Sequence, residues 1–344
     1  MKRLAARLSA AALALHIATA AAAPTGYLQR AEVRQFISEM VVKHGFVRKE
    51  LNLLFSRAQF QPAIIKSMDR PAGTPLNSWQ IYRGLFVNSQ RIDEGAQFWN
   101  RHSEALQRAA AEFGVPEEII VAIIGIETVY GRNVGTYRVI DALSTLAFDY
   151  PKRAEFFRSE LESYLLFARD AEIDVFQVKG SYAGAIGIPQ FMPGSYRRFA
   201  VDYDGDGRIN LAMSAADAVG SIGNFLKAHG WARGEAAAYL AEVSGNNWQN
   251  LAAAGVSPLF RVADLPLFGV KLDTPLPADT PCALIVLESP GQPSEFRVGL
   301  QNFHVLTRYN RSSFYAVAVL ELGAEIVRSR QQAVGRIEVK KENP

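Results

Sequence analysis

The sequence contains a single cysteine, Cys282, which excludes an intrachain disulfide. Its five histidines are scattered along the chain, so no zinc site is indicated. No glycine-rich phosphate loop precedes an expected helix, and no serine-centred nucleophile elbow is present. The protein must therefore be stabilised by its apolar core, which a chain of 344 residues can make large, and its length suggests two or three domains.

The chain also lacks a basic surplus once its first residues are set aside. The formal net charge is +3, and Lys2, Arg3 and Arg7 supply all of it. They precede an apolar stretch at residues 8–18 and a run of small residues, a pattern typical of a secretory signal peptide over residues 1–23. The apolar stretch is too short for a transmembrane anchor, and no cysteine follows it to carry a lipid. We therefore expect an unanchored periplasmic protein, and the neutral mature chain argues against a nucleic-acid partner.

Hydrophobic periodicity predicts a mostly helical chain with one small region of strands. Helical spacing occupies residues 33–56 and resumes after a break rich in proline and glycine at residues 71–75. The texture between residues 258 and 307 is strand-like, and the strands expected there are 283–287, 296–300 and 303–307. A last helix is expected over residues 312–328. The predicted fold class is therefore mainly α, with α+β character.

Glu127 stands at the end of an unusual helical segment. Residues 119–126 are apolar on every face apart from Gly125, so this helix is expected to be buried. A carboxylate there is costly unless it is protonated or paired, and burial raises its pKa. Such an acid stays protonated near neutral pH, as the general acid of a glycosidase must. Periodicity alone leaves open a structural glutamate that is bonded to the backbone or to an arginine.

Four stretches of the sequence, the first of which contains Glu127, bear on whether this residue is structural or catalytic. They are residues 123–131, residues 141–153, residues 180–193, and residues 307–310 followed by Tyr315. Together they resemble the membrane-bound lytic murein transglycosylase B family, in the family's order and across nearly the whole mature chain. A Glu-Thr pair alone would carry no weight, whereas the set is specific. The resemblance implies a goose-type-lysozyme-like catalytic core packed beside a helical N-terminal domain.

The resemblance also implies a reaction on the glycan strands of peptidoglycan. Glu127 would protonate the glycosidic oxygen between N-acetylmuramic acid and N-acetylglucosamine, then accept a proton from the 6-hydroxyl of the muramic acid residue. That oxygen would close on C1 and leave a 1,6-anhydro end. An ordinary glycosidase needs two carboxylates, and no second acid stands near the loop at 180–193. A hydrolytic muramidase and a non-catalytic peptidoglycan-binding protein remain the alternatives.

The family's substrate contacts carry over to aromatic and polar positions of this chain. They are Tyr82, Ser181, Gln190, Phe191, Tyr309, Asn310 and Tyr315. Aromatic faces suit stacking on sugar rings, and the polar groups suit hydroxyl and acetamido groups. Packing in the core is the alternative for Tyr82, Phe191 and Tyr309.

A second motif resembles the start of a calcium loop. Asp202, Asp204 and Asp206 occupy positions one, three and five, and the carbonyl of Arg208 could add a ligand. Position twelve is a methionine where a glutamate is expected, so Asp217 is the candidate for the closing ligand, as the family's longer loop implies. We expect a weakly held structural Ca²⁺ and no organic cofactor. An acid-rich turn without metal is the alternative.

The motifs and the periodicity together divide the chain into five parts. In order, these are a signal peptide at 1–23, an N-terminal helical domain at 24–84, a lysozyme-like catalytic core with the calcium loop at 85–257, a small β-rich region at 258–308, and a C-terminal helix and tail at 309–344. Proteins of the cell-wall synthesis machinery are candidate partners that the sequence leaves open.

Overall fold

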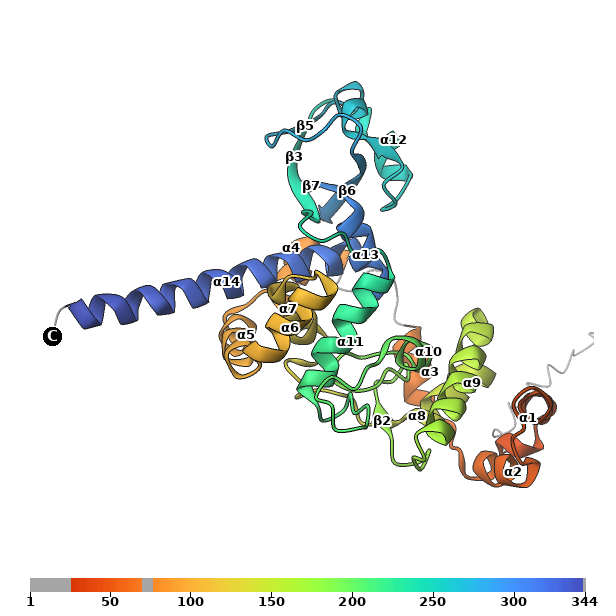
Figure 1. Cartoon of the computed structure of the whole chain (residues 1–344). Helices are drawn as coiled ribbons and strands as arrows, with labels where there is room; N and C mark the ends of the chain where they lie inside the picture. Colours follow the sequence, from red (N-terminus) through yellow and green to blue (C-terminus); the bar gives the residue numbers. More distant parts are fainter. Residues whose placement is uncertain (1–25, 70–76, 343–344) are drawn as a thin grey trace, which may run out of the picture. The chain divides into compact units, whose positions relative to one another are not determined.

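The computed structural model describes residues 26–69 and 77–342, with side chains as far as residue 333 (Figure 1). The predicted signal peptide at 1–23 lies outside the described residues. The chain forms two compact units, Met1–Ala58 and Gln59–Pro344. The first unit thus ends earlier than the predicted domain boundary at residue 84.

In its described part, residues 26–58, the first unit has three helical elements. They are η1 (Tyr27–Gln29), α1 (Ala31–His44) and α2 (Arg48–Arg57). Gly45 ends α1 in the left-handed conformation, with φ of 68°. The rings of Phe36 and Phe55 meet edge to face at 5.9 Å between α1 and α2. Burial of one apolar face of each helix holds this unit together.

The second unit begins with a series of helices, and one of them, α7, is buried in its core. The described helices before the sheet are α3 (Pro62–Met68), α4 (Trp79–Phe86), α5 (Ser89–Arg101), α6 (Ser103–Phe113), α7 (Glu117–Thr128), α8 (Val139–Asp149), η3 (Pro151–Arg153), α9 (Ala154–Asp170), α10 (Pro193–Phe199) and α11 (Ala215–Ala228). A short ladder pairs β1 (Tyr137–Arg138) with β2 (Lys179–Gly180). Every residue of α7 from Ile119 to Ile126 is buried. The prediction of a buried, uniformly apolar helix is therefore confirmed.

A five-stranded antiparallel sheet follows the helices, at the top of Figure 1. Its strands are β3 (Ala238–Val243), β4 (Phe260–Arg261), β5 (Val270–Leu272), β6 (Pro281–Ser289) and β7 (Gln292–Gly299), in the spatial order β4-β6-β7-β3-β5, with α12 (Trp248–Ala253) and η4 (Val262–Phe268) among them. Because β3 belongs to this sheet, the β-rich region begins before the predicted boundary at residue 258. Two helices close the chain, α13 (Gln301–Tyr309) and α14 (Ser313–Glu342).

The strand predicted at 303–307 is wrong, because these residues lie in α13. Phe303, Val305 and Thr307 alternate as in a strand, but Leu306 and Asn302 are buried as well. A short apolar run fits both periods, and contact with the rest of the core decides between them. None of the described helices is both long and apolar enough to cross a membrane.

Candidate active site

Glu127 lies one residue before the end of α7, and its side chain is partly buried. Burial raises the pKa of its carboxyl to about 7, and the Tyr315 hydroxyl, acting as a weak donor, opposes that rise. Tyr315 is buried, and its hydroxyl has no hydrogen-bond partner of normal length among the described residues. The carboxyl group is therefore close to half protonated at neutral pH, and it has a donor beside it that favours the charged form.

The backbone after Glu127 makes a strained turn. Val129 and Tyr130 have φ of 51° and 58°, a region that residues other than glycine rarely adopt. The turn brings the Tyr130 ring back over α7, where a Cβ at Gly125 would lie 2.4 Å from the tyrosine oxygen. The Tyr130 hydroxyl donates to the carbonyl of Arg91 at 2.7 Å. Surrounding contacts thus hold a costly backbone conformation directly beside the candidate acid.

Thr128 ties the end of α7 to the loop at 180–193. Its hydroxyl donates to the carbonyl of Ile188 at 2.9 Å and accepts from the backbone N–H of Gly131 at 3.0 Å. Thr128 itself is fully buried. Thr128 therefore fixes the loop at 180–193 directly beside the candidate acid.

Three tyrosines from three different helices surround the Glu127 carboxyl. Tyr82 comes from α4, Tyr309 from α13 and Tyr315 from α14. Burial raises the pKa of each phenol, and the charge of Glu127 raises it further. Tyr309 and Tyr315 stack with their ring centroids 6.2 Å apart. All three phenols stay neutral at physiological pH. They therefore surround the Glu127 carboxyl without forming an ion pair with it.

The remaining predicted substrate contacts have other partners. Gln190 has φ of 52°, and its amide donates to the carbonyls of Val134 at 3.2 Å and Gly187 at 2.9 Å. Ser181 accepts from the backbone N–H of Ala185 at 3.1 Å. These two side chains shape the loop at 180–193, and the described contacts do not connect either of them with Glu127.

Phe191 and Asn310 lie in opposite environments. Phe191 is 2% exposed and packs between Phe225 and Tyr309, at 5.6 Å and 5.9 Å between ring centroids. That burial favours the core-packing alternative for Phe191, as a support for Tyr309. Asn310 is exposed at the end of α13.

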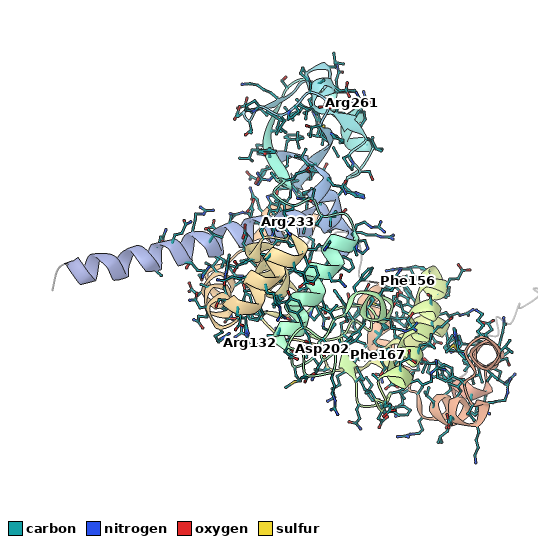
Figure 2. The ribbon with its side chains drawn as sticks, viewed as in Figure 1. Arg132, Phe156, Phe167, Asp202, Arg233 and Arg261 are labelled. Atoms are coloured by element: carbon teal, nitrogen blue, oxygen red, sulfur yellow. The ribbon has the colours of Figure 1, made fainter. Side chains whose placement is uncertain are left out.

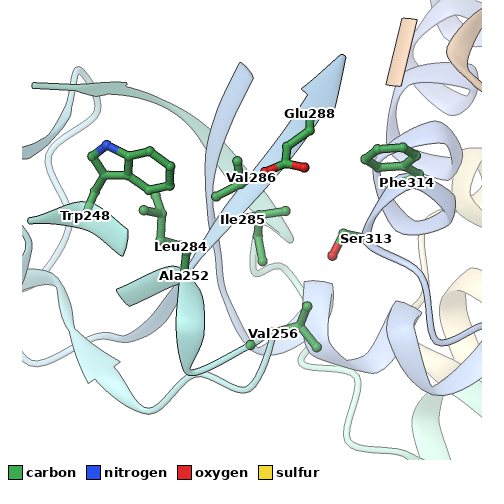
Figure 3. Close-up of a pocket in the computed structure, with 10 residues that line it drawn as sticks. Trp248, Ala252, Val256, Leu284, Ile285, Val286, Glu288, Ser313 and Phe314 are labelled. Carbon is green, nitrogen blue, oxygen red and sulfur yellow. The ribbon is translucent and has the colours of Figure 1, made fainter. Parts of the chain in front are cut away.

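A hollow of about 310 Å³ lies between the sheet and the start of α14, near Tyr82. Trp248, Leu284 and Glu288 line one side, and Phe314 lines the other (Figure 3). The Phe314 ring lies 5.7 Å from the ring of Tyr82. The hollow is thus one side chain away from the tyrosines that surround Glu127.

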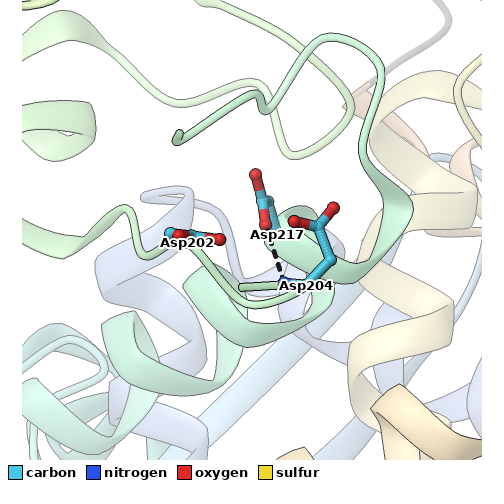
Figure 4. Close-up of side chains that lie close together, drawn as sticks. All are labelled: Asp202, Asp204 and Asp217. Atoms are coloured by element: carbon cyan, nitrogen blue, oxygen red, sulfur yellow. Dashed lines mark hydrogen bonds between the residues drawn. The ribbon is translucent and has the colours of Figure 1, made fainter. Parts of the chain in front are cut away.

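The acidic loop before α11 brings three carboxylates together. Oxygens of Asp202, Asp204 and Asp217 all lie within 4.8 Å of one another (Figure 4). Figure 2 marks the place of Asp202 in the chain. Asp217 is fully buried, and it accepts from the backbone N–H groups of Tyr203 at 2.7 Å and Asn210 at 2.7 Å. Hard oxygen donors at this separation fit Ca²⁺, which binds its ligands at about 2.3–2.6 Å.

The fourth predicted carboxylate, Asp206, is not part of that group. Asp206 and Arg208 are exposed, and the Asp206 carboxylate accepts from the backbone N–H of Arg208 at 2.8 Å. Asp204 accepts from the Ser214 hydroxyl at 2.6 Å, and this bond is the main cause that lowers the pKa of its carboxyl. The structure therefore brings together three of the four predicted carboxylate ligands, and Asp217 is one of them.

Known proteins match this chain over most of its length. Residues 28–324 match the transglycosylase SLT domain family. Membrane-bound lytic murein transglycosylase B of Escherichia coli K12 is 42% identical over 307 residues, which cover 87% of this chain and 83% of that protein. The chain belongs to the transglycosylase SLT family of lytic murein transglycosylases.

Solved structures of lytic transglycosylases have the same fold as this one. SltB1 from Pseudomonas aeruginosa, a catenated lytic transglycosylase, is 45% identical with a TM-score of 0.84, over 88% of this chain and 99% of that chain. Escherichia coli Slt35 in complex with calcium is 42% identical with a TM-score of 0.76, over 86% of this chain and 93% of that chain. The predicted family and the mainly helical fold class are confirmed.

Some features of this lytic transglycosylase site escaped the sequence analysis. Arg91 donates to the carbonyl of Gly125 at 3.1 Å, and its own carbonyl accepts from Tyr130. The strained turn at Val129 gave no sequence signal, because valine there would ordinarily indicate extended or helical backbone. The glycine at 125, inside an otherwise apolar helix, was the one visible sign that a ring approaches closely.

Proposed function

We propose that this lytic transglycosylase cleaves the β-1,4 bond between N-acetylmuramic acid and N-acetylglucosamine, with Glu127 as acid and then as base. Glu127 would protonate the departing oxygen and then accept the proton of the muramic acid 6-hydroxyl, which closes on C1 as a 1,6-anhydro ring. A single group can do both steps only if its pKa lies close to the working pH. The pKa of about 7 in a surround of neutral tyrosines is the observation that carries this proposal.

The absence of a second charged acid beside Glu127 supports internal attack over hydrolysis. In the described part of the chain, burial and the Tyr315 hydroxyl are what move the Glu127 pKa, without a contribution from a second carboxylate. Glu160 is another buried acid with a raised pKa, yet its carboxylate accepts from the backbone N–H of Gly194 at 2.7 Å. The Glu160 carboxylate therefore has a structural partner, whereas the Glu127 carboxyl faces tyrosine side chains that can stack on a sugar ring or bind its hydroxyl groups.

The proposed substrate contacts are the predicted polar and aromatic side chains. Tyr82, Tyr309 and Tyr315 would line the sugar next to Glu127, and Ser181, Gln190 and Asn310 would bind along the same strand. Phe191 would act from behind, by supporting the ring of Tyr309. The glycan strand of peptidoglycan is the proposed partner.

The test of this proposal is a product analysis on purified peptidoglycan. Mass spectrometry separates anhydro ends from hydrolytic ends, which are one water heavier. The wild type should give anhydro products, and Glu127→Gln should give none above background. Glu117→Gln is the matched control, because Glu117 lies on the same helix and accepts from the Trp99 indole at 2.6 Å, which a glutamine oxygen can also do. Reducing ends from the wild type would instead establish a hydrolytic muramidase.

We also propose that Asp202, Asp204 and Asp217 hold a structural Ca²⁺. The metal would neutralise three carboxylates and so fix the loop to the start of α11. The close grouping of their oxygens supports this, as does the calcium complex of the related Slt35. The effect would be on stability, with the proton chemistry left to Glu127.

Export to the periplasm is proposed from residues 1–23 and from the location of the substrate. Peptidoglycan lies outside the inner membrane, and the first residues have the pattern of a secretory signal. Fractionation of cells that express the chain with and without residues 1–23 tests this. Recovery of both forms in the cytoplasm would contradict it.

A further inference from the structure

Helix α4 places Tyr82 beside Glu127, and it is too short to hold its place alone. It has eight residues, and an isolated helix of that length is unstable in water. The Tyr82 ring packs on two rings of its own helix, 6.5 Å from Trp79 and 4.6 Å from Phe86, and on Phe314 of α14 at 5.7 Å. The place of α4 itself must therefore be set by what this helix binds elsewhere in the unit.

One carboxylate on α14 joins α4 to the sheet. Glu321 accepts from Arg83 Nε at 2.5 Å and from Nη2 of Arg297 on β7 at 2.7 Å. The side chains of Glu321 and Arg297 are 19% and 14% exposed, so this pair is largely shielded from water. Arg83 directly follows Tyr82 in the chain. Any movement of the Arg83–Glu321–Arg297 cluster would therefore move the tyrosine as well.

The β6–β7 hairpin binds the start of the same helix. The Trp79 indole donates to the Glu295 carboxylate at 3.1 Å, and the backbone N–H of Gln80 donates to the Ser289 hydroxyl at 3.1 Å. Trp79 is fully buried, and Ser289 is 6% exposed. Helix α4 is thus fixed by the hairpin at its first turn and by Glu321 one turn later.

We propose that Glu321 is a positioning residue for the reaction, which holds α4 between α14 and the β6–β7 hairpin so that Tyr82 stays against Glu127. This inference rests on the proposed function, since it concerns the same carboxyl group. It also gives the small sheet a part in the reaction, because Glu295, Ser289 and Arg297 all come from its central hairpin. The sheet would then act on the active site through α4.

Glu321→Gln tests this against a matched neighbour. The substitution keeps the shape of the side chain and removes the charge that two arginines share. Glu325→Gln is the control, because Glu325 stands one turn further along α14 and pairs with the exposed Arg328 at 2.7 Å. We expect kcat/KM on soluble glycan strands to fall roughly tenfold to a hundredfold for the first variant, as for other displaced active-site groups, and less than twofold for the second. Equal values for both variants would overturn the proposal.

A double-mutant cycle with Tyr82→Ala distinguishes positioning from general destabilisation. If Glu321 acts through Tyr82, then Glu321→Gln costs little once the ring is gone. The same fold-loss in both backgrounds would show that Glu321 acts by another route, and would overturn the proposal.

The pH profile is a second readout of the same effect. A displaced Tyr82 admits water to Glu127, which lowers the carboxyl pKa, so the alkaline limb of kcat/KM should move to lower pH. The titratable neighbours of Glu127 are Tyr82, Tyr309 and Tyr315, which are neutral across that range. An unmoved limb in an active Glu321→Gln variant would overturn the proposal.

Arg83→Met provides the test if Glu321→Gln does not fold. Arg83 is 44% exposed, and its removal leaves the Arg297–Glu321 pair intact. A loss of several-fold in kcat/KM that disappears in the Tyr82→Ala background is expected, and wild-type activity would overturn the proposal. Failure of the proposed function is distinguishable, because the wild type itself would then give no anhydro ends.

Discussion

At the scale of single residues, the proposed chemistry depends on how Glu127 is enclosed. Its neighbours include three phenols that are polar enough to accept a sugar and neutral enough to leave the proton on the acid. Burial without an ion-pair partner raises a carboxyl pKa, whereas a nearby arginine would lower it. Burial among these three tyrosines therefore explains why Glu127 can hold a proton near neutral pH and, in the proposed mechanism, can also transfer it.

Tyr315→Phe should move the alkaline limb of the activity profile to higher pH. The Tyr315 hydroxyl favours the charged carboxylate and so lowers the Glu127 pKa, and its removal lets the pKa rise above about 7. The protonated acid would then persist at higher pH. The pH dependence of kcat/KM measures this, and a limb that moves to lower pH would contradict the assigned role of Tyr315.

Glu127→Gln should stabilise the protein in alkaline solution relative to acid solution. The pKa of Glu127 in the folded protein, about 7, lies above the ordinary value of 4.5. Below pH 4.5 the carboxyl is protonated in both the folded and the unfolded state, so the wild type does not bear the cost of burying a charge. As the pH rises from 4.5 through 7, ionisation of the buried carboxyl lowers the unfolding free energy of the wild type, while the variant has no group to ionise at this position. The unfolding free energy of the variant minus that of the wild type should therefore grow by at most about 3 kcal/mol over that range. Denaturant unfolding at pH 4 and pH 8 measures it, and a constant difference would show that the pKa is not raised.

At the scale of elements, the end of α7 combines a predictable helix with a turn that no local pattern predicts. The apolar run at 119–126 was enough to predict burial, since a helix without a polar face has to be covered. The left-handed turn at Val129 and Tyr130 lies between a hydrogen bond from Tyr130 to Arg91 and one from Thr128 to Ile188, and both partners are remote in sequence. Local propensity could not reveal them.

The three tyrosines show the same limit. They come from α4, α13 and α14, and periodicity offered no reason to bring these segments together. Their candidacy came from the resemblance alone. The error at 303–307 belongs here too, because Phe303 and Val305 suited both a strand and a helix until the surrounding core selected α13.

Gly125→Ala should disrupt the turn after Glu127. The added carbon would lie 2.4 Å from the Tyr130 oxygen, so the ring must move and its bond to the Arg91 carbonyl weakens. Forcing atoms into a filled site costs about 1–3 kcal/mol. Thermal unfolding and kcat measure the effect, and both should fall.

Gly84→Ala is the control for that substitution. Gly84 lies inside a helix, with open space where the new carbon would stand, so alanine there should leave the melting temperature unchanged or raise it. If the two variants behaved alike, the packing of Tyr130 on α7 would not be what holds the turn.

At the scale of the whole molecule, long-range pairs join parts that the sequence analysis treated as separate. The sheet includes β3, which lies before the predicted β-rich region, because β3 pairs with β5 and β7 on either side. Strand-like texture placed the boundary at residue 258, but strand pairing places it earlier. In the acidic loop, the spacing of the aspartates indicated Asp202 and Asp204, whereas Asp217 followed from the resemblance.

Calcium should raise the melting temperature of the wild type. A metal that binds the folded loop alone adds about 2.7 kcal/mol at a hundredfold excess over its Kd. Asp217→Asn should abolish the increase, because Asp217 is the buried member of the group. Asp206→Asn should retain most of it, since Asp206 lies outside the group. Thermal unfolding with and without calcium measures this, and an unchanged wild type would remove the site.

The account depends most directly on the ionisation of Glu127 in the folded protein. Carbon-13 NMR of labelled glutamate carboxyls, recorded across pH for the wild type and for Glu127→Gln, assigns its titration by difference. We predict a midpoint near 7, as burial among the tyrosines requires. A midpoint near 4.5 would mean that the acid is already charged at neutral pH, and it would contradict the mechanism.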